Sequence, residues 1–190
     1  MSLLTFIQSA AKRNTLLNVF FFLALACSLT ACGGDDDYFK SPCLPSETEK
    51  QAQKVLDVKA IKKFLRENNV DTTQMKETAS GIHYLPITAG TGAQVTTGKT
   101  VQVHYIGKHL CAGLPSTCTF DESYSRQSPF TFTVGARQVI AGWEEALPLM
   151  KVGEETRFYI PSYLAYGPCG NSAIGPNEIL VFDIKVVKIL

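Results

Sequence analysis

The sequence has almost no net charge and no apolar run long enough to cross a membrane. Its 18 lysines and arginines stand against 17 aspartates and glutamates, and this balance implies no affinity for nucleic acid. The apolar stretch at residues 16–29 is shorter than the roughly 20 residues that a membrane-spanning helix needs. The chain also lacks a convincing Ser-His-Asp or Cys-His arrangement, which argues against nucleophilic catalysis.

The N-terminal segment has the features of an export signal. Two basic residues precede the apolar stretch, whose length is typical of the hydrophobic part of a signal peptide. Leu29-Thr30-Ala31-Cys32 then places small residues directly before a cysteine, an order that resembles a bacterial lipobox. The resemblance implies cleavage between Ala31 and Cys32 and lipid attachment at the Cys32 thiol, with several acyl chains for stable anchoring.

An ordinary secretory signal with an incidental cysteine is the alternative to a lipobox. Cys27 is a poorer lipidation candidate than Cys32, because Ala24 occupies the position where a lipobox has leucine. We predict a lipoprotein signal peptide over residues 1–31 and a flexible acidic tether over residues 32–45.

The residues after Cys32 indicate where in the cell the protein is located. Gly33 in this place resembles the outer-membrane sorting pattern of lipoproteins, which predicts a protein of the bacterial cell envelope, lipid-anchored to the outer membrane and facing the periplasm. A glycine followed by acidic residues also resembles surface-export signals of some bacterial groups, so surface exposure is the alternative.

Apart from Cys27 and Cys32, four cysteines remain, an even number that suits disulfides in an oxidising compartment. Three pairings are possible. Cys111 and Cys118 flank a turn-rich loop whose ends could meet, so we favour this pair and leave Cys43 with Cys169. A metal site that combines Cys111 with His104 and His109 has little support, because no second closely spaced ligand pair exists, and we predict no metal.

Residues 46–68 are predicted to form a helix. Ser46 and Glu49 have the spacing of a capping box. Apolar residues recur at helical spacing after it: Ala52, Val55, Leu56, Ile61, Phe64 and Leu65. We expect this face to pack within a monomer, with a dimer as the alternative. The helix and a polar connector together make an extension over residues 46–80.

Residues 81–190 form the predicted folded domain. β-Branched and alternating patterns predict strands near residues 83–87, 100–105, 130–134, 156–160 and 179–187, and one short helix fits between residues 142 and 150. About five strands with one helix indicate an α+β fold, in which a curled antiparallel sheet wraps around the helix.

The only tryptophan stands among several short motifs. Trp143 lies in an apolar turn before the predicted helix, where we expect it to form the floor of a pocket. The flanking motifs are Tyr105-Ile106-Gly107, Phe120-Asp121, Ala165-Tyr166-Gly167 and Leu180-Val181-Phe182-Asp183. Together with the run Val139-Ile140-Ala141-Gly142-Trp143, they resemble an FKBP-type peptidyl-prolyl isomerase over nearly all of residues 81–190.

The resemblance implies a fold and a set of site residues. The fold is the same curled sheet on one helix. Substrate-binding positions of the family correspond to Tyr105, Phe120, Phe130, Val139, Ile140, Trp143, Ile174 and Phe182. Catalytic positions correspond to Asp121, Tyr166 and the Ile140 backbone N–H, and Arg126 corresponds to a basic residue that orients the site. The loop after Tyr166 departs from the family pattern, with Gly175 where proline is common.

The implied activity is rotation of X-Pro peptide bonds in exported polypeptides, without a cofactor. Macrolides bind the pocket of this family, so they are implied as inhibitors. A peptide-binding or chaperone module of the cell envelope, with little or no catalysis, is the alternative function. An anchored surface adhesin is a third hypothesis, which rests only on the tether.

Overall fold

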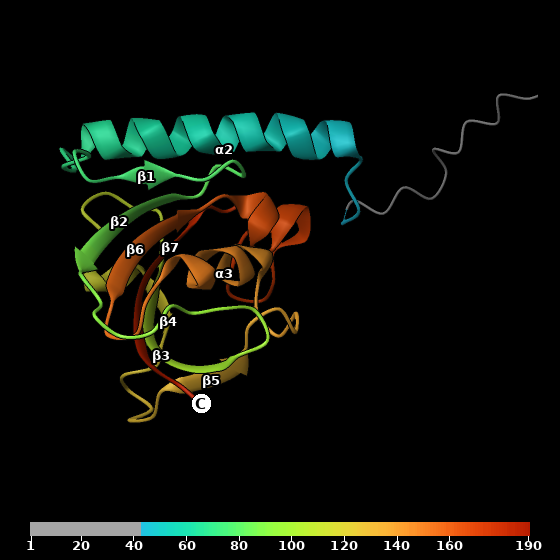
Figure 1. The fold of residues 1–190 in the computed structure, drawn as a ribbon. Coiled ribbons are helices and arrows are strands. Elements are labelled where there is room, and N and C mark those ends of the chain that lie inside the picture. The colour runs from blue at the N-terminus through green and yellow to red at the C-terminus, as the bar shows by residue number, and fades with distance from the viewer. Residues whose placement is uncertain (1–42) are drawn as a thin grey trace, which may run out of the picture. The chain divides into compact units, whose positions relative to one another are not determined.

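The computed structural model describes residues 43–190 (Figure 1). The predicted signal peptide, Cys32 and most of the tether lie outside these residues. Among the described residues, no helix combines the length and the apolar character needed to cross a membrane.

Helix α2 spans Glu47–Glu67 and begins with the predicted capping box. The Glu49 N–H donates to Ser46 Oγ at 3.3 Å, and the Ser46 N–H donates to the Glu49 carboxylate at 2.7 Å. These bonds satisfy two N–H groups that have no partner within the helix itself. The capping box predicted from sequence is therefore confirmed.

The second half of α2 packs on the sheet of the same chain (Figure 1). Ile61 and Leu65 are buried in a cluster with Tyr159 and Val181. The first half differs from the prediction, because Val55 and Leu56 each remain 59% exposed. The sheet residues that receive α2 contact only its second half, so half of the predicted apolar face lies in solvent.

A buried carboxylate also holds α2 in place. Asp57 is 2% exposed, and its Oδ2 accepts hydrogen bonds from the Ser162 N–H at 2.8 Å and the Ser162 hydroxyl at 2.7 Å. Gln53 donates to Oδ1 at 2.7 Å from one turn earlier in the helix. Ser162 begins the short 3-10 helix η4, Ser162–Leu164. The contact therefore joins α2 to the segment that leads into Tyr166.

Seven antiparallel strands form one curled sheet within the described residues. They follow the order β1-β2-β6-β7-β3-β4, with β5 paired to β3. The bounds are β1 Lys76–Glu77, β2 His83–Thr88, β3 Thr100–His109, β4 Thr119–Glu122, β5 Phe130–Thr133, β6 Glu155–Ile160 and β7 Leu180–Ile189. The five predicted strands are confirmed. The prediction missed β4 and also β1, which lies in the segment expected to be a connector.

One edge of strand β3 pairs with two short strands, β5 and β4. Its first half pairs with β5 from Thr100 to Val103, and its second half pairs with β4 from Ile106 to Lys108. The other edge pairs with β7 along almost the whole strand. Side chains from β3, β4, β5 and β7 therefore meet on the concave side of the sheet.

Helix α3 spans Ala141–Ala146 and lies against this side of the sheet (Figure 1). The 3-10 helix η3, Leu147–Leu149, extends it to the predicted length. Trp143 and Ala146 are buried against strand residues that include Phe158 and Ile184. A Cβ atom on Gly142 would lie 2.5 Å from Ile160 Cγ2, so only glycine permits this close approach of helix and sheet.

Two disulfides cross-link segments of the domain. Cys111 and Cys118, with Cα atoms 6.5 Å apart, join the ends of the loop between β3 and β4. Cys43 and Cys169, with Cα atoms 5.2 Å apart, join the segment before α2 to the 3-10 helix η5, Gly167–Cys169. Both pairs are those that the sequence favours. The second one connects residues 126 positions apart, and such a cross-link restricts the unfolded chain strongly.

Replacing Asp57 with alanine should lower the free energy of unfolding by about 2 kcal/mol, because two buried donors of Ser162 lose their acceptor. Asp57→Asn keeps an acceptor oxygen and should cost less. Urea unfolding followed through Trp143 fluorescence measures both changes. Lys59→Ala, at an exposed position of the same helix, is the control. Equal stabilities of the Asp57→Ala and Lys59→Ala variants would contradict the anchoring role.

Candidate active site

A cavity of about 260 Å³ opens on the concave side of the sheet. Most of its lining is aromatic or aliphatic. It is lined by Tyr105, Phe120, Asp121, Phe130, Gln138, Val139, Ile140, Trp143, Tyr166 and Phe182. The fold thus brings together, from strands, α3 and loops, nearly all of the substrate-binding and catalytic positions expected from sequence.

Trp143 is the most buried residue of the lining, with 4% of its surface exposed. Three rings stand nearly perpendicular to its indole, with centroids 5.0 Å away for Tyr105, 5.3 Å for Phe182 and 6.2 Å for Phe130. Edge-to-face contacts of this kind stabilise aromatic clusters beyond the area that they bury. The cluster therefore fixes the plane of the indole at the base of the cavity.

Gly107 leaves space for the rings of Phe120 and Phe182 at the cavity. A Cβ atom there would lie 2.7 Å from Phe120 Cζ and 2.8 Å from Phe182 Cε1. These two rings meet edge to face, with centroids 5.7 Å apart. Any side chain at position 107 would push one of them out of place.

A polar cluster forms one side of the cavity. Tyr105 donates its hydroxyl hydrogen to Asp121 Oδ2. Arg126 donates from Nη1 to Asp121 Oδ1 at 2.8 Å and from Nη2 to the Tyr105 hydroxyl oxygen at 2.6 Å. Arg126 therefore contacts both Asp121 and Tyr105, as expected of a residue that orients the site, and the three side chains hold one another in a single arrangement.

The same contacts set the charges of the cluster. Burial raises the pKa of Tyr105 to about 12, and its hydrogen bond to Asp121 acts in the same direction. Burial would raise the pKa of Asp121, but hydrogen bonds from Tyr105 and Arg126 and the positive charge of Arg126 together hold it below its ordinary value. At neutral pH, Asp121 is thus a carboxylate and Tyr105 a neutral hydroxyl.

Two hydrogen-bond donors stand at the cavity rim. The Ile140 carbonyl accepts the Trp143 N–H at 2.9 Å at the start of α3, whereas the Ile140 N–H has no hydrogen-bond partner in residues 43–190. Tyr166 is 40% exposed, and η5 with its disulfide follows it directly. Both groups are available to the backbone of a bound polypeptide.

Ile174 does not line the cavity. It is 2% exposed and belongs to the main hydrophobic core. Asn171 closes the turn that contains Ile174: its Oδ1 accepts the N–H groups of Ala173 and Ile174, both at 2.8 Å, and its own N–H donates to the Ile174 carbonyl at 2.8 Å. This turn accompanies the packing of the Ile174 side chain into the core.

Gln138 lines the cavity although no motif indicated it. Its Oε1 accepts the Thr133 N–H at 2.8 Å, which ties the loop before α3 to the end of β5. Its position directly before Val139 and Ile140 is the only sequence signal that could have indicated it.

The residues of the alternative metal site are engaged elsewhere. Cys111 is in a disulfide, His104 stacks on Tyr124, and His109 is hydrogen-bonded to Glu178. Over residues 43–190, no group of three or more histidine, cysteine or acidic side chains is placed to hold a metal ion.

Comparison with known proteins identifies the class to which this fold and cavity belong. Residues 92–187 match the family of FKBP-type peptidyl-prolyl cis-trans isomerases. The chain belongs to this family.

Individual relatives agree with the family match. The chain is 40% identical to the probable FKBP-type isomerase FkpA of Neisseria meningitidis over 164 residues, which cover 75% of this chain and 57% of that protein. It is 42% identical to FK506-binding protein 1 of Saccharomyces cerevisiae over 105 residues, which cover 54% of this chain and 88% of the yeast protein. The match to FkpA of Aeromonas hydrophila covers 42% of that protein, so this chain spans about half the length of these bacterial relatives.

Solved structures show the same fold. An isomerase from Pseudomonas syringae pv. tomato is similar with a TM-score of 0.57 and 31% identity, over 77% of this chain and 98% of that one. FkpA from Escherichia coli is similar with a TM-score of 0.59 and 32% identity, over 75% of this chain and 63% of that one.

Replacing Gly107 with alanine should displace the Phe120 or Phe182 ring and lower the free energy of unfolding by about 1–3 kcal/mol. Gly175→Ala is a matched control, because a Cβ atom there meets only the end of the Glu178 side chain at 3.3 Å. Urea unfolding measures both variants. If Gly107→Ala proved as stable as Gly175→Ala, position 107 would not constrain the two rings.

Proposed function

We propose that this chain is a peptidyl-prolyl cis-trans isomerase that accelerates X-Pro bond rotation in exported proteins. The observation that carries the proposal is the ring-lined cavity above Trp143, with the cluster of Asp121, Tyr105 and Arg126 at its side. An apolar cavity with a few polar groups at its edge suits a proline ring joined to a polar backbone.

The reaction requires no bond to form or break. Rotation about a peptide bond crosses a barrier of about 18–20 kcal/mol, which arises from amide resonance. The planar amide is more polar than the twisted one, so an environment that excludes water from the amide favours the twisted transition state. Each tenfold acceleration requires about 1.4 kcal/mol of such preference.

The geometry supports a distinct role for each group. Trp143, Phe130, Val139 and Phe182 would hold the proline ring, and the rim donors at Ile140 and Tyr166 would bond the substrate's carbonyl oxygens. Asp121, fixed by Arg126, would lie beside the rotating carbonyl and orient the site. Bond rotation needs no proton transfer, and the constant charge state of Asp121 and Tyr105 over a wide pH range suits such a mechanism.

Trp143→Leu and Asp121→Val should each lower kcat/KM for an X-Pro peptide by at least about tenfold, because one removes the base of the cavity and the other its orienting carboxylate. Glu122→Val is the matched control, since Glu122 is in the same strand as Asp121 and does not line the cavity.

Circular dichroism must show that all three variants are folded. Unchanged turnover in both site variants would contradict the proposed site. Wild-type protein that binds the peptide without accelerating exchange would favour the peptide-binding or chaperone alternative.

We also propose that this cavity binds an FK506-like macrolide. The yeast relative is named for FK506 binding, and the lining of this cavity keeps all of the expected substrate-binding positions except Ile174. We further infer a monomer, because the second half of α2 packs on the sheet of its own chain.

We propose that the protein is anchored in the bacterial envelope through a lipid on Cys32. The lipobox-like order around Cys32 supports this location, and so do two disulfides, which form and persist in oxidising compartments. The bacterial relatives include FkpA proteins and the Mip isomerase of Coxiella burnetii. Gly33 supports the proposal of an outer-membrane position facing the periplasm, with surface exposure as the alternative.

Cys32→Ala should move the protein from the membrane fraction to the soluble fraction, because the lipidated thiol is the proposed anchor. Incorporation of labelled palmitate into the wild type and its loss in the variant measure the modification directly. Cys27→Ala is the control and should label normally. Label retained by Cys32→Ala and lost by Cys27→Ala would place the lipid at the other cysteine.

A further inference from the structure

Strand β3 has a gap between its two partners on one edge. Pairing with β5 ends at Val103, and pairing with β4 begins at Ile106. Tyr105 lies in this gap, where no strand of residues 43–190 pairs with it on that edge. Because the Tyr105 hydroxyl belongs to the polar cluster of the candidate active site, the contacts that hold the Tyr105 backbone also set the position of that hydroxyl.

Ser123 fills the gap. It directly follows β4 and is 0% exposed. Its Oγ accepts the Tyr105 N–H at 2.9 Å, and its own N–H donates to the Tyr105 carbonyl at 3.0 Å. The hydroxyl thus takes the place that a backbone carbonyl oxygen has in a regular antiparallel pair. Both backbone groups of Tyr105 are therefore bonded, although the ladder of paired strands is interrupted.

The chain changes direction directly after Ser123. Residues 124–127 form a turn, and a backbone hydrogen bond of 3.1 Å joins its two ends. Arg126 lies in this turn and bonds both Asp121 and the Tyr105 hydroxyl. Ser123 therefore lies in the sequence between the two residues that bond the Tyr105 hydroxyl, and it bonds the Tyr105 backbone itself.

His104 contacts the same hydroxyl. Its Nδ1 lies 3.0 Å from Ser123 Oγ, and its ring stacks on Tyr124 with the centroids 4.6 Å apart. Two consecutive residues of β3 are thus held by two consecutive residues that follow β4. Bonds to both His104 and Tyr105 confine the buried hydroxyl to one place.

We propose that Ser123 is a positioning residue of the candidate active site, whose hydroxyl holds the Tyr105 backbone so that Tyr105, Asp121 and Arg126 can bond one another. Ser123 is buried and does not line the cavity, so it acts only through these residues. Without the hydroxyl, the Tyr105 N–H loses its acceptor, and the turn that carries Arg126 can move relative to β3. The effect on catalysis rests on the proposed isomerase function, whereas the effect on Asp121 does not.

Ser123→Ala tests the proposal through the charge of Asp121. Burial would raise the pKa of Asp121, but hydrogen bonds from Tyr105 and Arg126 hold it below its ordinary value, so a loosened cluster should raise it toward that value. Carbon-13 NMR of the Asp121 carboxyl carbon during an acid titration measures this pKa. Ser123→Thr keeps the hydroxyl and should keep the pKa low. Ser125→Ala is the matched control, because Ser125 is exposed in the same turn.

Turnover gives a second measurement. Ser123→Ala should lower kcat for an X-Pro peptide by about threefold to tenfold and change KM little, because the residues that line the cavity remain. Ser123→Thr and Ser125→Ala should keep the wild-type kcat.

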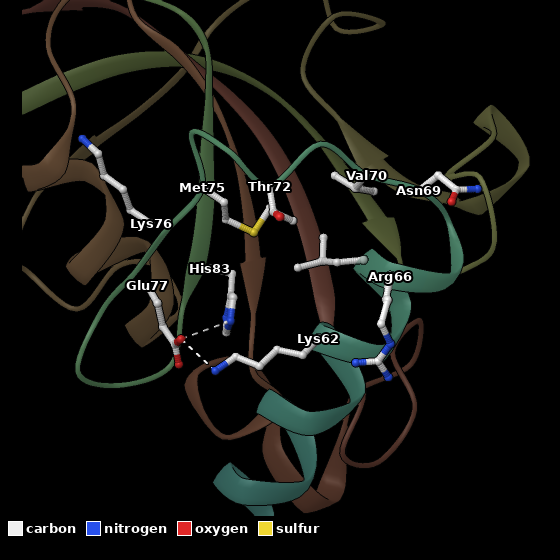
Figure 2. A pocket seen from close by; sticks show the side chains of 10 residues that line it. Lys62, Arg66, Asn69, Val70, Thr72, Met75, Lys76, Glu77 and His83 are labelled. Atoms are coloured by element: carbon white, nitrogen blue, oxygen red, sulfur yellow. Dashed lines mark ion pairs between the residues drawn. The ribbon is translucent and has the colours of Figure 1, made fainter.

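A separate cavity provides the check on folding. Figure 2 shows this cavity beside the second half of α2, where Lys62 and Glu77 are among its lining residues, none of which lines the candidate active site. The change removes a single oxygen atom, so the amide signals of Lys62 and Glu77 should be the same in Ser123→Ala as in the wild type.

A folded Ser123→Ala variant with the wild-type Asp121 pKa would overturn the proposal. An equal rise of this pKa in Ser123→Ala and Ser123→Thr would also overturn it, because the hydroxyl would then not be the cause. A raised pKa with an unchanged kcat would contradict the role in catalysis. If the wild type itself does not accelerate exchange, the proposed function fails, and the Asp121 pKa still decides whether Ser123 positions the cluster.

Discussion

Edge-to-face packing around Trp143 is the interaction on which the candidate active site depends. The rings that hold the indole come from β3, β5 and β7, so the cavity exists only when these strands are correctly paired. Gly142 and Gly107 make the packing possible, one by letting α3 approach β6 and the other by leaving space for two rings. Site and core are therefore one structure, and a change that loosens the core would also reshape the cavity.

Hydrogen bonds from Arg126, rather than ring packing, hold the polar side of the cavity. Arg126 is exposed, yet it bonds both Asp121 and Tyr105, so a surface side chain fixes the orientation of groups inside the cavity. Their pKa values move in opposite directions, and the pair keeps one charge state across the physiological range. A reaction that proceeds by bond rotation alone suits a site of constant charge.

The sequence predicts the parts of this structure that local rules or contiguous motifs determine. The capping box at Ser46 and Glu49 and the alternation in β5 are local, and the motif around Trp143 locates most of the cavity. Strand β4 could not be found in this way, because its four residues are held by pairing with the distant β3 and show no alternation of burial. Ile174 is placed by a turn through Asn171, and the exposure of Val55 depends on where the sheet ends beneath α2.

The most direct test is exchange spectroscopy by NMR on a short X-Pro peptide without titratable side chains, with the purified protein added. The account predicts accelerated cis-trans exchange with a rate that is constant between about pH 5 and pH 9, because Asp121 and Tyr105 titrate outside that range. A bell-shaped dependence on pH would contradict a mechanism without proton transfer. Absence of acceleration by folded protein would contradict the proposed activity itself.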